Sequence, residues 1–196
     1  MNKEIIRISE LLKKELDVPR YEHTIGVMHT AACLAMRYDA NLIDKALMAG
    51  LLHDCAKCTS HVDKIRICAE NHIDVTKTEL KNPGLLHAKV GAFFAKEKYN
   101  IEDPEILDAI VCHTTGKPAM TLLDKILYIA DYMEPGRDKA SNLPVVRDLA
   151  FKDLNQCLYV ILKDSLDYLK TRNIPIDPMT EDTFMYYNSI NSKGEI

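Results

Sequence analysis

The feature that most constrains this chain is an apolar segment that runs directly into a histidine and an aspartate, residues 46–54 (ALMAGLLHD). Such a segment is typical of a buried helix, so an imidazole and a carboxylate lie at the end of a core element. Burying an isolated charge is strongly unfavourable unless a partner compensates it. A bound cation would do so, and His23, His87, His113 and Asp131 offer further ligands. We therefore expect one metal centre with helices arranged around it.

Length and composition indicate an ordinary globular protein. The 196 residues suffice for one domain with a substantial core, and we expect that domain over residues 1–188, followed by a flexible tail over 189–196. The net charge of -4, without a basic block, argues against nucleic acid as a partner. Charges interrupt the N-terminal segment, so it has neither a signal-peptide core nor a membrane-spanning run. We expect a cytoplasmic protein without a membrane partner, whose six cysteines are reduced.

Apolar residues recur at helical spacing along the chain, and no stretch alternates as a half-buried strand does. Pro19, Pro83-Gly84 and Pro135-Gly136 separate the helical segments. Residues 71–83 indicate irregular or short helical structure. We expect an all-α fold with helices over residues 3–16, 20–38, 42–54, 60–71, 85–97, 104–113, 121–133 and 144–170, and a last short helix from Pro178.

Helical position separates candidate ligands from ordinary histidines. His23 lies on the apolar stripe of its helix, whereas His29, six positions later, is rotated by about 240° and points elsewhere. His61 and His72 lie in polar segments, and we expect all three to be ordinary surface residues. The remaining donors mix imidazole and carboxylate, a set that suits iron or manganese better than an all-thiolate zinc site. The first-ion candidates are His23, His53, Asp54 and Asp131.

A second ion is the next candidate. His87 and His113 could hold it, with Asp54 bridging, or they could contact a phosphate directly. Two metals about 3.5–4 Å apart would activate a hydroxide and hold phosphate oxygens for in-line displacement. Asp131 lies near a helix C-terminus, where the helix dipole disfavours a carboxylate. It therefore needs a positive partner, unless it simply becomes exposed at the end of the helix.

Three cations lie close to these ligands in the sequence, namely Arg20, Lys57 and Arg137. Arginine can bind a phosphate through two parallel hydrogen bonds, and lysine supplies a point charge. The turn at Pro135-Gly136 brings Arg137 back toward Asp131. Thr114, beside His113, could donate a hydrogen bond to a phosphate. Each cation taken alone could equally be a solvated surface residue.

In this order, the ligand residues resemble those of the HD-domain superfamily of metal-dependent phosphohydrolases. Five segments are similar to the YqeK-type bacterial family of symmetrical dinucleoside tetraphosphate hydrolases, and the resemblance extends over about residues 5–175. They are RYEHTIGV (20–27), LLHDCAK (51–57), LLHAKVGA (85–92), HTTGKPAM (113–120) and ADYMEPGR (130–137).

The resemblance implies an HD-domain helical bundle and a divalent two-metal centre, with iron favoured and manganese or cobalt also suitable. It also implies that metal-bound hydroxide attacks a central phosphorus of diadenosine tetraphosphate, giving two molecules of ADP. Asp54, Lys57 and His113 would be catalytic, with Lys57 or His113 assisting the leaving phosphate. The implied metal ligands are His23, His53, Asp54 and Asp131, with His87 and His113 at the second metal or the phosphates.

Substrate binding follows from the same resemblance. The segment 170–175 after the long helix would reach the nucleoside through Lys170, Arg172 and Asn173. The residues expected at the phosphates are Arg20, Lys57, His87, His113, Thr114 and Arg137.

The residue pattern alone stops at a metal-dependent hydrolase of a phosphate ester or anhydride. Two alternatives therefore stand beside the tetraphosphatase. One is another HD-type nucleotide phosphatase or phosphodiesterase, and the other is a non-catalytic nucleotide-sensing module. Adenine and guanine substrates, with ADP or GDP as products, fit the pattern equally well, and an exposed apolar stripe is compatible with a homodimer.

Overall fold

Eleven α-helices and two short 3₁₀ segments make up residues 3–192, the part of the chain that this computed structural model describes. No strand occurs in that range, so the all-α prediction is confirmed. The helices are α1 (Lys3–Glu15), α2 (Val18–Tyr38), α3 (Ile43–Leu52), α4 (His61–Glu70), α5 (Lys77–Lys81), α6 (His87–Glu97), α7 (Pro104–Cys112), α8 (Leu122–Met133), α9 (Leu143–Leu149), α10 (Leu154–Thr171) and α11 (Pro178–Asn191). The 3₁₀ segments are η1 (Ala40–Leu42) and η2 (Pro83–Leu86).

Side-chain caps fix where the helices that carry the site begin. Asp17 accepts a hydrogen bond from the backbone amide of Arg20 at 2.8 Å, which starts α2 with Pro19 in its first turn. Thr121 and Asp124 form a reciprocal capping box at the start of α8. These two starts determine the helical phase that turns His23 and Asp131 inward.

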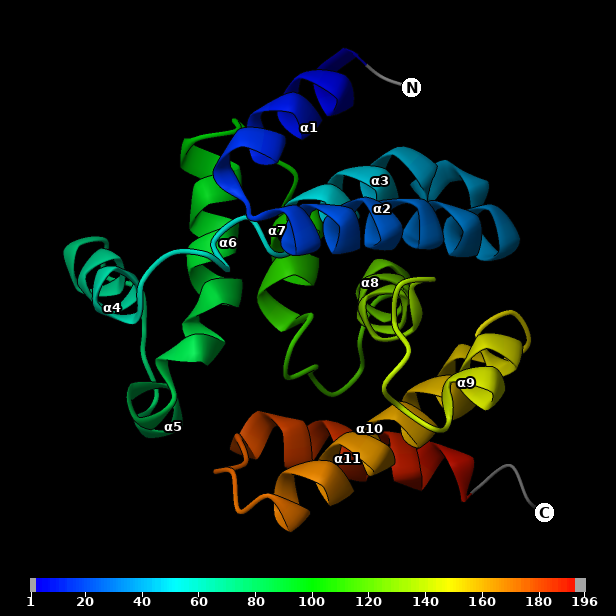
Figure 1. The fold of residues 1–196 in the computed structure, drawn as a ribbon. Helices are drawn as coiled ribbons and strands as arrows, with labels where there is room; N and C mark the ends of the chain where they lie inside the picture. The colour runs from blue at the N-terminus through cyan, green and yellow to red at the C-terminus, as the bar shows by residue number, and fades with distance from the viewer. Residues whose placement is uncertain (1–2, 193–196) are drawn as a thin grey trace.

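Packing of α2 along α3 forms the centre of the fold (Figure 1). Helix α8 packs against both of them, and α7 packs against α3 and α8. Helices α10 and α11 pair with each other on the far side of α8 (Figure 1). The apolar faces of these helices meet in one core, represented by fully buried residues such as Val27, Leu51, Ile110 and Leu127. Every helix in residues 3–192 is too short or too polar to traverse a lipid bilayer.

The prediction of a single long helix over residues 144–170 is wrong, because the helix is interrupted between α9 and α10. The side chain of Asp153 accepts hydrogen bonds from the amides of residues 155 and 156 and starts a new helix. The hydroxyl of Tyr38 donates to the carbonyl of Ala150 at 2.9 Å, which holds the intervening turn against the end of α2.

Other differences are smaller. The other helices with predicted bounds agree with the structure to within two residues at each end, and the last helix, predicted as short, begins at Pro178 as predicted but is 14 residues long. The short helix α5 lies in the segment 71–83. The predicted tail begins at residue 189, but α11 continues to Asn191; residues 193–196 lie outside the described range.

Cysteine exposure gives a first test of this packing. Cys33 and Cys58 are exposed, whereas burial raises the pKa of the other four thiols, that of Cys157 to about 12. Since the thiolate is the reactive form, we expect Ellman's reagent to modify two thiols per native chain and all six in denaturant. Rapid modification of a third thiol in native protein would contradict the packing. The buried thiols are Cys55, Cys68, Cys112 and Cys157.

Candidate metal centre

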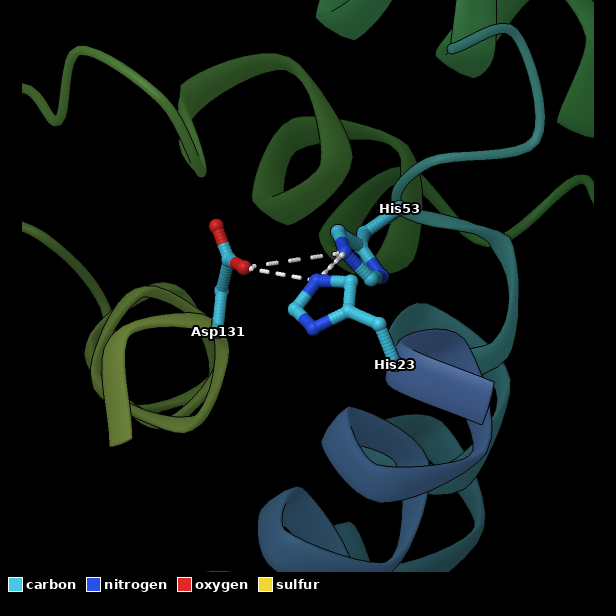
Figure 2. Close-up of side chains that lie close together, drawn as sticks. All are labelled: His23, His53 and Asp131. Atoms are coloured by element: carbon cyan, nitrogen blue, oxygen red, sulfur yellow. Dashed lines mark hydrogen bonds and ion pairs between the residues drawn. The ribbon is translucent and has the colours of Figure 1, made fainter. Parts of the chain in front are cut away.

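His23, His53 and Asp131 come from three different helices and point toward one another (Figure 2). His23 lies in the first half of α2, His53 directly follows α3, and Asp131 lies in the last turn of α8. The Nε2 atom of His23 is 3.0 Å from Asp131 Oδ1 and 3.3 Å from His53 Nε2. His53 Nε2 is 3.9 Å from the same carboxylate oxygen. These three atoms could therefore contact one cation.

Asp54 lies between this group and two further histidines. Its Oδ2 atom is 3.5 Å from His53 Nε2 and 3.9 Å from His23 Nε2. Its Oδ1 atom is 3.2 Å from His87 Nε2 and 3.7 Å from His113 Nε2. Oδ1 is buried and has no hydrogen-bond partner. Lys57 Nζ lies 3.5 Å from it as an ion pair. A buried carboxylate oxygen without a hydrogen bond is costly, so the arrangement fits a cation at Oδ1 as well as one near Oδ2.

All four histidines present Nε2 to this cluster because Nδ1 is engaged elsewhere. Each Nδ1 faces a carbonyl or carboxylate oxygen, which can only accept, so Nδ1 carries a proton; in the neutral ring Nε2 then has a free lone pair. The Nε2 atoms of His87 and His113 nevertheless lie 3.0 Å apart. In neutral rings two lone pairs at that distance repel, and either Lys57, whose Nζ lies 3.1 Å from His87 Nε2, or a bound cation would reduce the repulsion. The Nδ1 partners are Gly50 O for His53 (2.8 Å), Gly84 O for His87 (2.6 Å), Ile110 O for His113 (2.6 Å) and Glu134 Oε1 for His23 (3.1 Å).

The electrostatics favour the ionised form of both carboxylates and the neutral form of His87. Burial alone would raise the pKa of Asp54, but His53, His113 and His87 together outweigh it and hold the pKa well below its usual range. The pKa of Asp131 is also lowered: burial opposes the shift, and the imidazole of His23, whose Nε2 lies 3.0 Å from Oδ1, makes the largest contribution in its favour. Burial lowers the pKa of His87 to about 4. At neutral pH the carboxylates are ionised and His87 is neutral.

Three cations border the cluster, as their place in the sequence predicts. Arg20 Nη1 lies 2.6 Å from Asp54 Oδ2, and Arg137 Nη2 lies 2.7 Å from Asp131 Oδ1. Lys57 Nζ is 3.1 Å from His87 Nε2 and 3.5 Å from Asp54 Oδ1. Their side chains are 28%, 42% and 37% exposed for Arg20, Arg137 and Lys57, respectively. Since each cation touches the cluster and solvent together, it can meet an anion that arrives from outside.

The remaining predicted residues divide into two groups. Thr114 Oγ1 lies 3.2 Å from His87 Nε2 and 3.1 Å from His113 Nε2, so it belongs to the cluster. Within residues 3–192, no hydrogen bond or ion pair joins the exposed Lys170, Arg172 and Asn173 to it. The three histidines expected at the surface, His29, His61 and His72, are exposed.

Sequence reasoning missed Glu134. Its buried carboxylate accepts from His23 Nδ1, and both residues border a cavity of about 420 Å³ together with Pro19, Glu22, Gly26, Pro135 and Gly136. One signal was available, because Glu134 follows Asp131 by three residues at the end of α8 and precedes Pro135-Gly136. Nothing local in the sequence, however, links it to a histidine 111 positions earlier.

Comparison with known proteins identifies similar chains over nearly the whole length. A model of the HD domain matches residues 20–136. A Bacillus subtilis protein named bis(5'-nucleosyl)-tetraphosphatase, symmetrical, is 41% identical over 90% of this chain and 92% of its own. A Staphylococcus aureus protein of the same name is 34% identical over 94% of both chains. A crystal structure of a Clostridium acetobutylicum protein, described as a predicted HD superfamily hydrolase involved in NAD metabolism, matches with a TM-score of 0.90 and 36% identity over 94% of this chain and 96% of its own.

Proposed function

This chain belongs to the HD-domain family, and from its full-length relatives within that family we infer that it hydrolyses diadenosine tetraphosphate symmetrically to two molecules of ADP. Relatives that match about nine-tenths of both chains bear the name of that activity. The observation that carries the inference is this full-length similarity combined with the His/Asp cluster. The cluster alone would support a metal-dependent hydrolase without naming its substrate.

We propose that the cluster holds two divalent ions. His23, His53 and Asp131 would hold one with Asp54 Oδ2, and His87 and His113 would hold the other with Asp54 Oδ1. The separate surroundings of the two Asp54 oxygens support this division. The mixed imidazole and carboxylate donors suit iron, manganese and cobalt alike, and the family resemblance favours iron among them. Bound ions would lower the pKa of coordinated water and neutralise charge on phosphate oxygens.

The reaction itself sets requirements that the surrounding cations fit. A water oxygen bonds to one of the two central phosphorus atoms, and the bond from that phosphorus to the central bridging oxygen breaks. The departing ADP keeps the electron pair, and the water loses its protons. We propose that Arg20 and Arg137 bind phosphate oxygens, because both reach solvent beside the carboxylates. Lys57 is better placed than His113 to stabilise the departing phosphate, because its ammonium is partly exposed and His113 is buried.

The nucleoside ends of the substrate extend beyond the cluster. We propose Lys170, Arg172 and Asn173, exposed at the end of α10, as contacts for one of them. Because such contacts act on binding rather than on the phosphorus, replacing Lys170 and Arg172 by alanine should raise KM and leave kcat nearly unchanged. An unchanged KM would remove the segment from the binding site.

Product analysis with metal depletion tests the function. Protein purified without chelator should contain about two ions of iron or manganese per chain and release ADP as the sole nucleotide. Chelation should abolish turnover, and ferrous or manganous ion should restore it. Equal amounts of AMP and ATP would contradict symmetrical cleavage. Release of inorganic phosphate across a nucleotide panel would indicate a phosphatase, and nucleotide binding without products would indicate a sensor.

A further inference from the structure

Three of the four clustered histidines use the same local device to hold their rings. His53 and His113 come directly after α3 and α7, and His87 directly after η2. In each case Nδ1 faces the backbone carbonyl three residues earlier. Carbonyls near helix ends have spare acceptor capacity for this bond, and the Gly84 carbonyl accepts it in addition to the backbone amide of His87. The backbone thus orients these three rings without any other side chain.

His23 cannot use this device, because it lies within α2 with helix on both sides. The carbonyls of the preceding turn accept the helical hydrogen bonds, so the acceptor must come from elsewhere. Glu134 supplies it: its Oε1 lies 3.1 Å from His23 Nδ1. Glu134 is the residue that ends α8, three positions after Asp131. The C-terminal end of α8 therefore supplies contacts to both ring nitrogens of His23: Asp131 lies next to Nε2, and Glu134 accepts from Nδ1.

The surroundings of Glu134 are shaped to hold its carboxylate. Its side chain is 5% exposed, and Oε2 accepts a hydrogen bond from the amide of Gly136 at 2.5 Å. A Cβ atom at Gly26 would lie 2.5 Å from Oε2, and one at Gly136 would lie 3.0 Å from it. A side chain at either position would therefore displace this carboxylate from its present place. Arg147 donates to the carbonyls of Met133 and Glu134 at 3.0 Å each and fixes the turn.

The Glu134 carboxylate matters because His23 has an alternative tautomer, with the proton on Nε2. Asp131 Oδ1 is 3.0 Å from His23 Nε2 and would accept a proton carried there. A ring protonated on Nε2 and bonded to Asp131 has no lone pair to offer an ion. Glu134 favours the other tautomer, because its charged oxygen is a strong acceptor for Nδ1–H.

We infer that Glu134 is a positioning residue, whose carboxylate holds His23 in the Nδ1–H tautomer and directs the Nε2 lone pair into the cluster. The inference rests on the proposed function only in assigning a metal to this cluster. It does not depend on the substrate. Partners of this kind behind metal-ligating histidines typically contribute about 10- to 100-fold in metal affinity.

The test uses Glu134→Ala and Glu134→Gln, with Glu22→Gln as the matched control. Glu22 is an exposed carboxylate next to His23 that lines the same cavity. Two quantities are measured: ring ¹⁵N chemical shifts of His23 in metal-free protein, and manganous ion affinity by chelator competition. We expect Nδ1–H in wild type and a shift toward Nε2–H in Glu134→Ala, with affinity lower by about 10- to 100-fold. Glu134→Gln should lose less, since its amide oxygen still accepts from His23. Glu22→Gln should match wild type.

Unchanged tautomer and affinity in Glu134→Ala would overturn the inference. So would a lower melting temperature with unchanged affinity, because Glu134 would then serve the fold alone. If Glu134→Ala does not fold, Glu134→Gln decides, and wild-type affinity there counts against the inference. If the wild-type protein binds no metal, the proposed function is contradicted. The ¹⁵N shifts would still show whether Glu134 determines the tautomer of His23.

Discussion

Replacing Asp54 by asparagine should reduce hydrolysis of diadenosine tetraphosphate by about a thousandfold or more, which is about 4 kcal/mol of the activation barrier. The carboxylate is the only one, among those the structure describes, that lies within 4 Å of all four clustered Nε2 atoms. Asparagine keeps its shape but removes the charge and turns one oxygen into a donor. A donor facing Arg20 or Lys57 is repelled, and it cannot bind an ion.

Metal content and turnover should be measured together for this variant. We expect no more than one ion per chain, a residual kcat near the detection limit, and helical content by circular dichroism equal to that of wild type. Asp63→Asn is the control, because Asp63 is a carboxylate whose partners, Ser60 and Arg66, lie outside the cluster. Turnover of Asp54→Asn within tenfold of wild type would refute the bridging role of Asp54.

Helical phase explains why the sequence can predict which residues meet in the His/Asp cluster. Val27 and His23 lie on the same apolar face of α2, so the burial of Val27 also directs His23 inward. The apolar segment of α3 leads into His53, which is buried as well. Arg137 follows from the Pro135-Gly136 turn, which can only reverse the chain after α8. Each of these inferences needs only residues close in sequence. The all-α fold is predictable for the same reason.

Features that depend on distant partners escape such reasoning. Val146, Ala150, Leu154 and Leu158 are all buried at a spacing of four, so the apolar period continues across the break between α9 and α10. The helix is interrupted there by the Asp153 cap and by the hydrogen bond from Tyr38 to the Ala150 carbonyl. Neither feature can be detected from the period of the apolar residues. Glu134 was missed for the same reason.

The site also depends on how closely α2 and α3 approach each other, and Gly50 sets that distance. A Cβ atom at Gly50 would lie 2.7 Å from Met28 Cα and 3.0 Å from Met28 N, which are backbone atoms of α2. Backbone cannot rotate away as a side chain can, so the helices must separate. The carbonyl of Gly50 also accepts from His53 Nδ1, and α2 carries His23. Separation would therefore move two candidate ligands apart while it loosens the core.

Gly50→Ala should consequently destabilise the protein, although glycine to alanine in an ordinary helix interior stabilises by about 1 kcal/mol. Overpacking of this kind costs about 1–3 kcal/mol, which in a chain of this size lowers the melting temperature by roughly 2–12 °C. Manganous ion affinity should fall as well. Gly91→Ala is the matched control, because its Cβ would meet His53 O at 3.4 Å and Ile110 Cγ2 at 3.5 Å, which are ordinary contacts. That variant should melt at or slightly above the wild-type temperature. A melting temperature of Gly50→Ala at or above that of wild type would contradict the proposal that the close approach of α2 and α3 holds His23 and His53 together.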